Sequence, residues 1–329
     1  MRTFDSVIGH KEIISHLRNA ISMGKVSHAY LFCGEEGSGK KLLASIFAAA
    51  LQCDRRGTDP CGTCSSCKKA EGGNHPDIIR VTHEKPATIG IEEIRSQLVE
   101  DVGIKPYTGP YKIYIVDEAE KLTVQAQNAI LKTIEEPPAY AVILLLTSNA
   151  EALLPTISSR CVKLKLKAVS DTMIKNYLID ACRLPDYQAE MDAAFAQGNV
   201  GKAQKIATSE EFSQIRDYAL RILKYSKDMP MQELVDTMKR LSQEKETIYD
   251  YLDLFLMWFR DVLLFKATWE VDNLVFKQEI NAIRERARSS SYEGLESIIN
   301  AIEKAKKRLH ANVNFDLTME LLFLTIREN

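Results

Sequence analysis

The sequence predicts an α/β domain followed by a part that consists of helices alone. Three observations lead to this prediction. Of the 15 glycines and 10 prolines, 12 and eight lie before residue 169, so the residues that break regular structure gather in the first half of the chain. In that half, short apolar runs alternate with helical patterns, as in a mostly parallel sheet that is covered on both faces. From residue 169 onward the strand-like runs stop and helical periodicity continues to the end.

The first predicted elements lead into a glycine-rich loop. Apolar residues at helical spacing predict a helix over residues 10–23, and Gly24 is a suitable stop. The apolar run at 29–33 predicts a strand, and residues 40–51 predict a second helix. The order of strand, glycine-rich loop and helix is one in which a helix N-terminus can bind a phosphate group.

Four more strands and two more helices complete the predicted sheet. Apolar runs predict strands at 77–81, 112–116, 142–146 and 161–166. Helical patterns occupy 91–99 and 124–134, and the second of these stops at Glu136, Pro137 and Pro138. We therefore expect the first domain to be α/β.

The second half predicts two groups of helices. Three short ones at 170–181, 188–196 and 200–207 are separated by Pro185 and Gly198. Longer ones follow without interruption, as expected for a helical bundle. Their predicted ranges are 210–225, 230–242, 247–265, 275–287, 292–311 and 315–326.

Hydropathy predicts where in the cell the protein works, whereas the net charge neither supports nor excludes binding to nucleic acid. The formal net charge is only −2, and a surface that binds DNA would need local clustering that this total conceals. No signal-peptide core follows the first residues, and no run of 18 apolar residues occurs, so we expect a cytoplasmic protein without a membrane span. In that reducing compartment the seven cysteines do not predict disulfides.

Residues Gly34 to Lys41 fit the phosphate-binding pattern G-x-x-x-x-G-K. Such a loop binds phosphate because backbone N–H groups form an anion cradle, the helix dipole adds to it, and a lysine reaches the outer phosphates. Lys41 stands where a serine or threonine hydroxyl would ligate Mg²⁺, and an ammonium cannot ligate a cation. ATP and Mg²⁺ are therefore expected as possible but weakened ligands. The candidates in the loop are Gly34, Gly37, Ser38, Gly39, Lys40 and Lys41.

Two other strand ends carry polar residues that a nucleotide site could use. Asp117 and Glu118 follow the strand at 112–116, where an aspartate can hold Mg²⁺ and a glutamate can polarise a water. Acidic pairs at strand ends also serve as helix caps, so a purely structural role stays open. Asn149 follows the strand at 142–146 and could orient a water near a phosphate or cap the end of the strand.

Four cysteines with the spacing C-x7-C-x2-C-x2-C lie in a segment with almost no apolar residues. Zn²⁺ takes four soft ligands in a tetrahedron, and the close spacing lets consecutive turns present thiolates to one ion. Four thiolates leave no open position for catalysis, so we expect a structural site. Its predicted ligands are Cys53, Cys61, Cys64 and Cys67.

Further short motifs follow one another in a fixed order over residues 4–208. They are Val7 to His10, Ser27 to Phe32, Asn74 to Asp77, Leu131 to Pro137, and Ser159 to Cys161. In this combination, with the phosphate loop and the cysteine insertion, the chain resembles the clamp-loader branch of the AAA+ ATPases. Within that branch it is similar to the family of delta-prime subunits of bacterial DNA polymerase III.

The resemblance implies three domains and a place in a larger assembly. Residues 1–168 would form an AAA+ P-loop domain with a zinc module at 53–74, residues 169–209 a three-helix lid, and residues 210–329 a helical collar. The partners would be the tau/gamma and delta subunits in a hetero-pentamer. The sliding clamp and primed DNA would be reached through that complex, with no membrane contact.

The resemblance also assigns roles to two residues and predicts which kind of subunit this is. By itself, Arg160 reads as a solvated charge or the partner of a carboxylate, but in the family the arginine of Ser-Arg-Cys is a finger that acts in trans on a neighbour's ATP site. Glu118 would be a degenerate catalytic residue. Lys41 replaces the metal-binding hydroxyl, and Gly201 aligns with the arginine that senses nucleotide in motor subunits. We therefore expect a stator with little or no ATPase activity alone.

Two alternatives stay open at this point. An ATP-hydrolysing subunit of the tau/gamma kind, or a stand-alone AAA+ ATPase, is favoured by the retained phosphate loop and by Asp117 and Glu118. A zinc-containing DNA-binding module is disfavoured because the cysteine insertion lacks aromatic residues. Its only basic residues are Arg55, Arg56, Lys68 and Lys69.

Overall fold

The computed structural model describes residues 2–225, 230–244, 247–311 and 313–329. Two compact units are present. The first comprises Met1–Tyr177 with Gly198–Lys202, and the second comprises Leu178–Gln197 with Ala203–Asn329. In the described parts of the chain, no helix combines the length and the apolar character that crossing a membrane requires.

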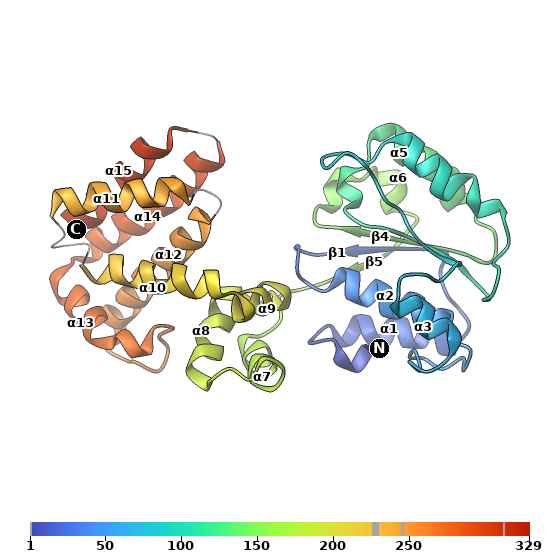
Figure 1. Ribbon diagram of the computed structural model, residues 1–329, viewed down its shortest axis with the longest axis horizontal. Helices are drawn as coiled ribbons and strands as arrows, with labels where there is room; N and C mark the ends of the chain where they lie inside the picture. Colours follow the sequence, from blue (N-terminus) through green and yellow to red (C-terminus); the bar gives the residue numbers. More distant parts are fainter. Residues whose placement is uncertain (1, 226–229, 245–246, 312) are drawn as a thin grey trace. The chain divides into compact units, whose positions relative to one another are not determined.

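The first unit is built on a parallel sheet, as the sequence predicts (Figure 1). The described strands follow the order β2-β3-β4-β1-β5, which places the first strand between the fourth and the fifth. All pairs are parallel. The strands are β1 (Ala29–Cys33), β2 (Ile78–Arg80), β3 (Lys112–Val116), β4 (Ala141–Thr147) and β5 (Val162–Lys165).

Helices cover both faces of this sheet (Figure 1). Because side chains alternate along a strand, Tyr30 and Phe32 enter one core with α1 (Lys11–Ser22) and α2 (Lys40–Leu51). Leu31 enters the opposite core. The helices over that second face are α4 (Ile91–Ile94), α5 (Val124–Glu135) and α6 (Pro155–Ser158). Uninterrupted apolar strands such as β4 are thus explained by burial on both sides.

The elements of this unit differ from the predicted ranges in four places. The helix expected at 91–99 consists of α4 and a π-helical turn, Arg95–Val99. Helix α3 (Ser65–Glu71), which the sequence analysis did not predict, is polar and begins with Cys64 as its N-cap. Strands β2 and β5 are each one residue shorter at both ends than expected. The remaining described turns are η1 (Phe4–Ser6), η3 (Asp101–Gly103), η4 (Ala119–Lys121) and η5 (Ala150–Ala152).

The second unit consists of helices around one apolar core. Its longest described helix is α12 (Ile248–Thr268), which buries residues such as Phe255 and Trp258. This helix packs against α10 (Glu210–Tyr225), α13 (Ile280–Ser289) and α14 (Tyr292–His310). The helical second half predicted from the sequence is therefore confirmed. The other helices described from residue 210 onward are α11 (Met231–Gln243) and α15 (Phe315–Glu328).

Helix α13 begins five residues later than predicted, for a physical reason. The backbone N–H groups of Val275 and Phe276 donate to the carboxylate of Asp261 at 2.8 and 2.7 Å. These donors are thus held by a side chain of α12, and the chain makes the short turn η6 (Lys277–Glu279) before the helix starts at Ile280. A buried acidic residue fixes this boundary, which the apolar pattern alone could not locate.

The three short helices expected between the halves are also present. They are α7 (Asp171–Cys182), α8 (Asp186–Ala196) and α9 (Val200–Thr208). The division into compact units runs through α7, after Tyr177, and through α9, after Lys202, and the whole of α8 belongs to the second unit. A separate lid with limits at 169 and 209 stays a prediction.

Candidate functional site

The glycine-rich loop lies at the carboxyl end of β1, which is placed between β4 and the edge strand β5. In open α/β sheets this is where ligands bind, at the point where the strand order reverses. The N–H of Gly34 donates to the carbonyl of Thr147 on β4 at 3.1 Å, which fixes the start of the loop. Gly37 and Gly39 have φ values of +80° and +99°, which residues with a Cβ rarely adopt. The loop therefore has the backbone that its sequence predicts.

Lys40 is folded back onto its own loop. Its Nζ donates to the carbonyls of Gly34 at 2.5 Å and Glu35 at 2.8 Å, and the residue is only 9% exposed. Burial lowers the pKa of this lysine, while the nearby carboxylates of Glu120 and Asp117 act in the opposite direction. The cation that would reach outer phosphates is thus positioned at the loop.

Lys41 forms an ion pair with Asp117. The two atoms, Nζ of Lys41 and Oδ2 of Asp117, are 2.5 Å apart, and the Lys41 side chain is 73% exposed. The hydrogen bond to Asp117 raises the pKa of Lys41, so its ammonium stays charged. Mg²⁺ takes oxygen ligands in a near-octahedral arrangement. The residues present do not fit that ion, because a cationic group stands where a hydroxyl ligand belongs and contacts the carboxylate ligand.

Glu118 is held by other side chains. It adopts a left-handed backbone with φ of +49°, its carboxylate lies 2.8 Å from Nζ of Lys121, and Nε2 of His83 is 3.6 Å away. Lys121, as the main cause, holds the pKa of Glu118 below its ordinary value. The structure thus places Asp117 and Glu118 at the end of β3, each with a lysine partner.

Asn149 is engaged in the backbone after β4. Its Oδ1 accepts a hydrogen bond from the N–H of Glu151 at 3.0 Å, which caps the turn η5. Beside it, Ser148 donates to the carboxylate of Glu120 through its hydroxyl and its N–H. Glu120 is a site residue that the sequence analysis missed, since nothing in the spacing distinguishes it from other acids. A role of Asn149 toward nucleotide stays a prediction.

The start of α9 contacts the phosphate loop within the first unit. Nδ2 of Asn199 donates to the carbonyl of Glu36 at 2.6 Å, and the N–H of Gly201 donates to the carbonyl of Gly37 at 3.0 Å. A Cβ at position 201 would lie 2.6 Å from that same carbonyl oxygen. Any larger residue there, arginine included, would require the two segments to separate.

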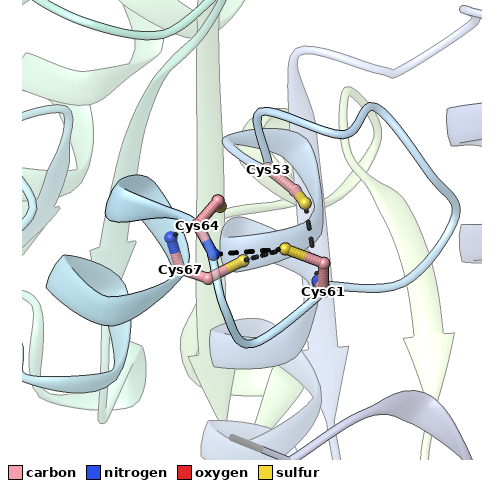
Figure 2. Close-up of side chains that lie close together, drawn as sticks. All are labelled: Cys53, Cys61, Cys64 and Cys67. Carbon is pink, nitrogen blue, oxygen red and sulfur yellow. Dashed lines mark hydrogen bonds between the residues drawn. The ribbon is translucent and has the colours of Figure 1, made fainter.

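The four predicted zinc ligands lie together, as Figure 2 shows. Their sulfur atoms all lie within 4.8 Å of one another. Backbone N–H groups of Cys61, Cys64 and Cys67 donate to the sulfur of the preceding cysteine in the set at 3.4, 3.4 and 3.3 Å. Such donors favour the thiolate form, and four thiolates at this separation fit a tetrahedral Zn²⁺. The cluster could therefore hold a metal ion.

Asp77 anchors a loop next to this insertion. It is fully buried, and its carboxylate accepts four hydrogen bonds, from the N–H groups of Tyr107, Thr108 and Gly109 and from the Thr108 hydroxyl, at 2.6 to 3.1 Å. Its own N–H donates to Nδ1 of His75. The sequence showed Asp77 only as part of a motif, because its partners lie about thirty residues away.

Arg160 is exposed, and its guanidinium makes three contacts, of which the longest is the hydrogen bond to Oγ of Ser159 at 3.4 Å. Its guanidinium lies 2.9 Å from a carboxylate oxygen of Glu135 and donates to the carbonyl of Thr156 at 3.0 Å. The side chains of Arg160 and Glu135 are 41% and 45% exposed. The guanidinium is thus oriented at the surface and accessible from outside the chain.

Comparison with known proteins gives consistent results over most of the chain. Models of two families match, "DNA polymerase III, delta subunit" at residues 9–170 and "DNA polymerase III, delta subunit, C terminal" at residues 210–328. The delta-prime subunit of DNA polymerase III from Bacillus subtilis is 32% identical over 96% of this chain and 95% of its own length. The tau subunit from the same organism is 28% identical over 96% of this chain but only 60% of its own length.

A solved structure has a similar fold. A DNA polymerase III gamma subunit-related protein from Thermotoga maritima aligns with a TM-score of 0.50 and 20% identity, over 96% of this chain and 98% of the other. At this identity the likeness concerns the fold alone.

Proposed function

The chain belongs to the delta-prime family of DNA polymerase III clamp-loader subunits, and we propose that it acts as a stator in such a clamp loader. In this role it would help to load a sliding clamp onto primed DNA by assembling with tau/gamma and delta subunits in a hetero-pentamer. The helices α10 to α15 would serve as its collar. We place this work in the cytoplasm, as expected from the sequence.

The proposal rests on Arg160. Its guanidinium is exposed, and Glu135 and Thr156 orient it. A guanidinium presents several N–H donors in a rigid fork, which suits the charge that spreads over phosphoryl oxygens during transfer. The γ-phosphate of ATP bound to a neighbouring subunit could replace Glu135 as the anionic partner. Arg160 would then act in trans, while the phosphate loop of its own chain would take no part in hydrolysis.

The cysteine cluster has a structural part in this proposal. A bound Zn²⁺ would cross-link the end of α2 to the loop and to α3 through Cys53, Cys61, Cys64 and Cys67. Backbone N–H groups would keep the sulfur atoms in place. With four protein ligands the ion would have no position for a substrate.

The test is the ATPase activity of a loader reconstituted with Arg160→Ala. Loss of an arginine finger lowers turnover at the affected site by about 10³-fold or more. The steady-state ATPase rate of the loader, measured in the presence of DNA and clamp, should fall by the fraction of the total activity that this site contributes. Arg95→Ala is the matched control, because Arg95 is also an exposed arginine with one carboxylate partner, Glu92. Unchanged ATPase activity in a fully assembled ring containing Arg160→Ala would refute the finger assignment.

An ATP-hydrolysing subunit is the second candidate, and the similarity to the tau subunit favours it. A turnover assay on the isolated chain separates the two. The stator proposal expects no hydrolysis above the level of an Asp117→Asn, Glu118→Gln double variant, whereas a motor subunit would exceed that level clearly.

A further inference from the structure

The carboxylates around the phosphate loop already have partners inside the chain. Asp117 contacts the ammonium of Lys41 at 2.5 Å, and Glu118 contacts the ammonium of Lys121 at 2.8 Å. Glu120 accepts hydrogen bonds from Ser148. A divalent cation would therefore have to compete with an ammonium for Asp117 and for Glu118, and with the two Ser148 donors for Oε1 of Glu120.

We infer that the ammonium of Lys41 takes the place of Mg²⁺ in this pocket and excludes divalent cations from it. This inference rests on the proposed stator function and deepens it, because it names the residue that keeps the pocket free of metal. Mg²⁺ binds oxygen at about 2.0–2.1 Å, so an ion on Asp117 would occupy nearly the same space as the ammonium. The two cations repel each other, and only one of them can hold this carboxylate.

The position of Lys41 in α2 supports the same conclusion. The helix begins after Gly39, so Lys41 lies in its first turn, where the macrodipole disfavours a positive charge. The ion pair with Asp117, with Nζ 2.5 Å from Oδ2, offsets this disadvantage. A lysine at this place is thus favourable only together with the carboxylate that would otherwise ligate the metal.

Exclusion does not depend on a rigid side chain. Lys41 is 73% exposed and could swing away from Asp117. Even then the position would offer no oxygen ligand, and the charge would stay within a side chain's length of the site. Loss of a ligand and repulsion by a cation act in the same direction, and both are removed by one substitution, Lys41→Thr.

The experiment measures how Mg²⁺ changes the affinity of the full-length chain for a non-hydrolysable ATP analogue, adenylyl imidodiphosphate. For the unmodified chain, titrations of the analogue in excess Mg²⁺ and in chelator should give the same dissociation constant, or should show no binding under both conditions. Lys41→Thr should bind the analogue at least tenfold more tightly with Mg²⁺ than with chelator. Electron paramagnetic resonance should then detect about one Mn²⁺ per chain in the variant complex and none at this site in the unmodified chain.

Two controls separate the causes. Lys41→Ala removes the ammonium without supplying a hydroxyl, and its Mg²⁺ dependence should lie between those of the other two chains. Lys11→Thr makes the same charge change at an exposed position of α1 and should behave as the unmodified chain. Stronger binding by the unmodified chain in Mg²⁺, or no Mg²⁺ dependence in a folded Lys41→Thr, would overturn the inference. Neither result would affect the stator proposal, since that stands or falls with Arg160 in the assembled loader.

Discussion

The two ends of helix α2 balance charge in different ways. At its first turn, Lys41 neutralises Asp117 within the chain. Directly beyond its other end, Cys53 lies in a cluster with three other cysteines. The described hydrogen bonds to these sulfur atoms come from neutral N–H, O–H and S–H groups. Thiolates this close repel one another unless a cation lies between them. The comparison teaches that a motif could hold a metal when the chain offers no cation of its own to the motif, and does not suit one when a side chain supplies the cation.

The largest expected effect is at the cysteine end. Cys67 is fully buried at the start of α3, and replacing it by serine, or removing metal with a chelator, should destabilise the segment at 53–74. Metal binding and folding are coupled in such modules, so we expect a loss of more than about 3 kcal/mol. Elemental analysis, urea unfolding and limited proteolysis of the segment provide the measurements.

The matched control is Cys182→Ser, which removes a half-buried thiol outside the cluster. It should keep the metal content unchanged. A zinc content far below one per chain, in protein never exposed to a chelator, would contradict the comparison at its cysteine end.

An intermediate loss of stability is expected for Asp77→Asn, because neutral hydrogen-bond donors, and not a cation, stabilise the negative charge of Asp77. Burial by itself raises the pKa of Asp77, but the hydrogen bonds from Tyr107, Thr108 and Gly109 outweigh it and hold the pKa below its ordinary value. The asparagine amide keeps one acceptor oxygen, but its NH₂ group would face N–H and O–H groups that are themselves donors, so those hydrogen bonds are lost. We expect a loss of about 2–3 kcal/mol at pH 7, measured by urea unfolding.

The pH dependence of this loss follows from the lowered pKa. A carboxylate with a depressed folded-state pKa contributes stability above its unfolded pKa, about 3.9, and loses it as the pH falls through the folded value. The two chains should therefore approach each other in stability below about pH 4. Asp316→Asn, at an exposed position, should change stability by less than about 0.5 kcal/mol at either pH. A constant difference between pH 7 and pH 3 would argue against a role for the charge.

The sequence was informative where local patterns decide the structure. Apolar runs located the inner strands β1, β3 and β4 because burial on both faces leaves few polar positions there, and glycine positions located the phosphate loop. Patterns of this kind could not locate contacts between distant segments. The pairing of Lys41 with Asp117, the four bonds to Asp77 and the contact of Gly201 with Gly37 all join residues far apart in the chain. Helix α3 was missed because a polar helix fixed by a cysteine cap has no apolar stripe.

The smallest effect on stability is expected at the other end of α2, for Asp117→Asn. Exposed ion pairs contribute at most about 1 kcal/mol, since water screens the charges and ordering the side chains costs entropy. Lys41 and Asp117 are 73% and 30% exposed, so the variant should lose less than about 1 kcal/mol. A double-mutant cycle with Lys41→Met should give a coupling within the same limit. A coupling above about 2 kcal/mol would mean that the pair holds the fold together, and the two ends of α2 would then differ less than the charges indicate. A weak coupling would mean that the ion pair contributes little to stability and that its main consequence is to occupy the metal position. A charge can exclude a cation without stabilising the fold.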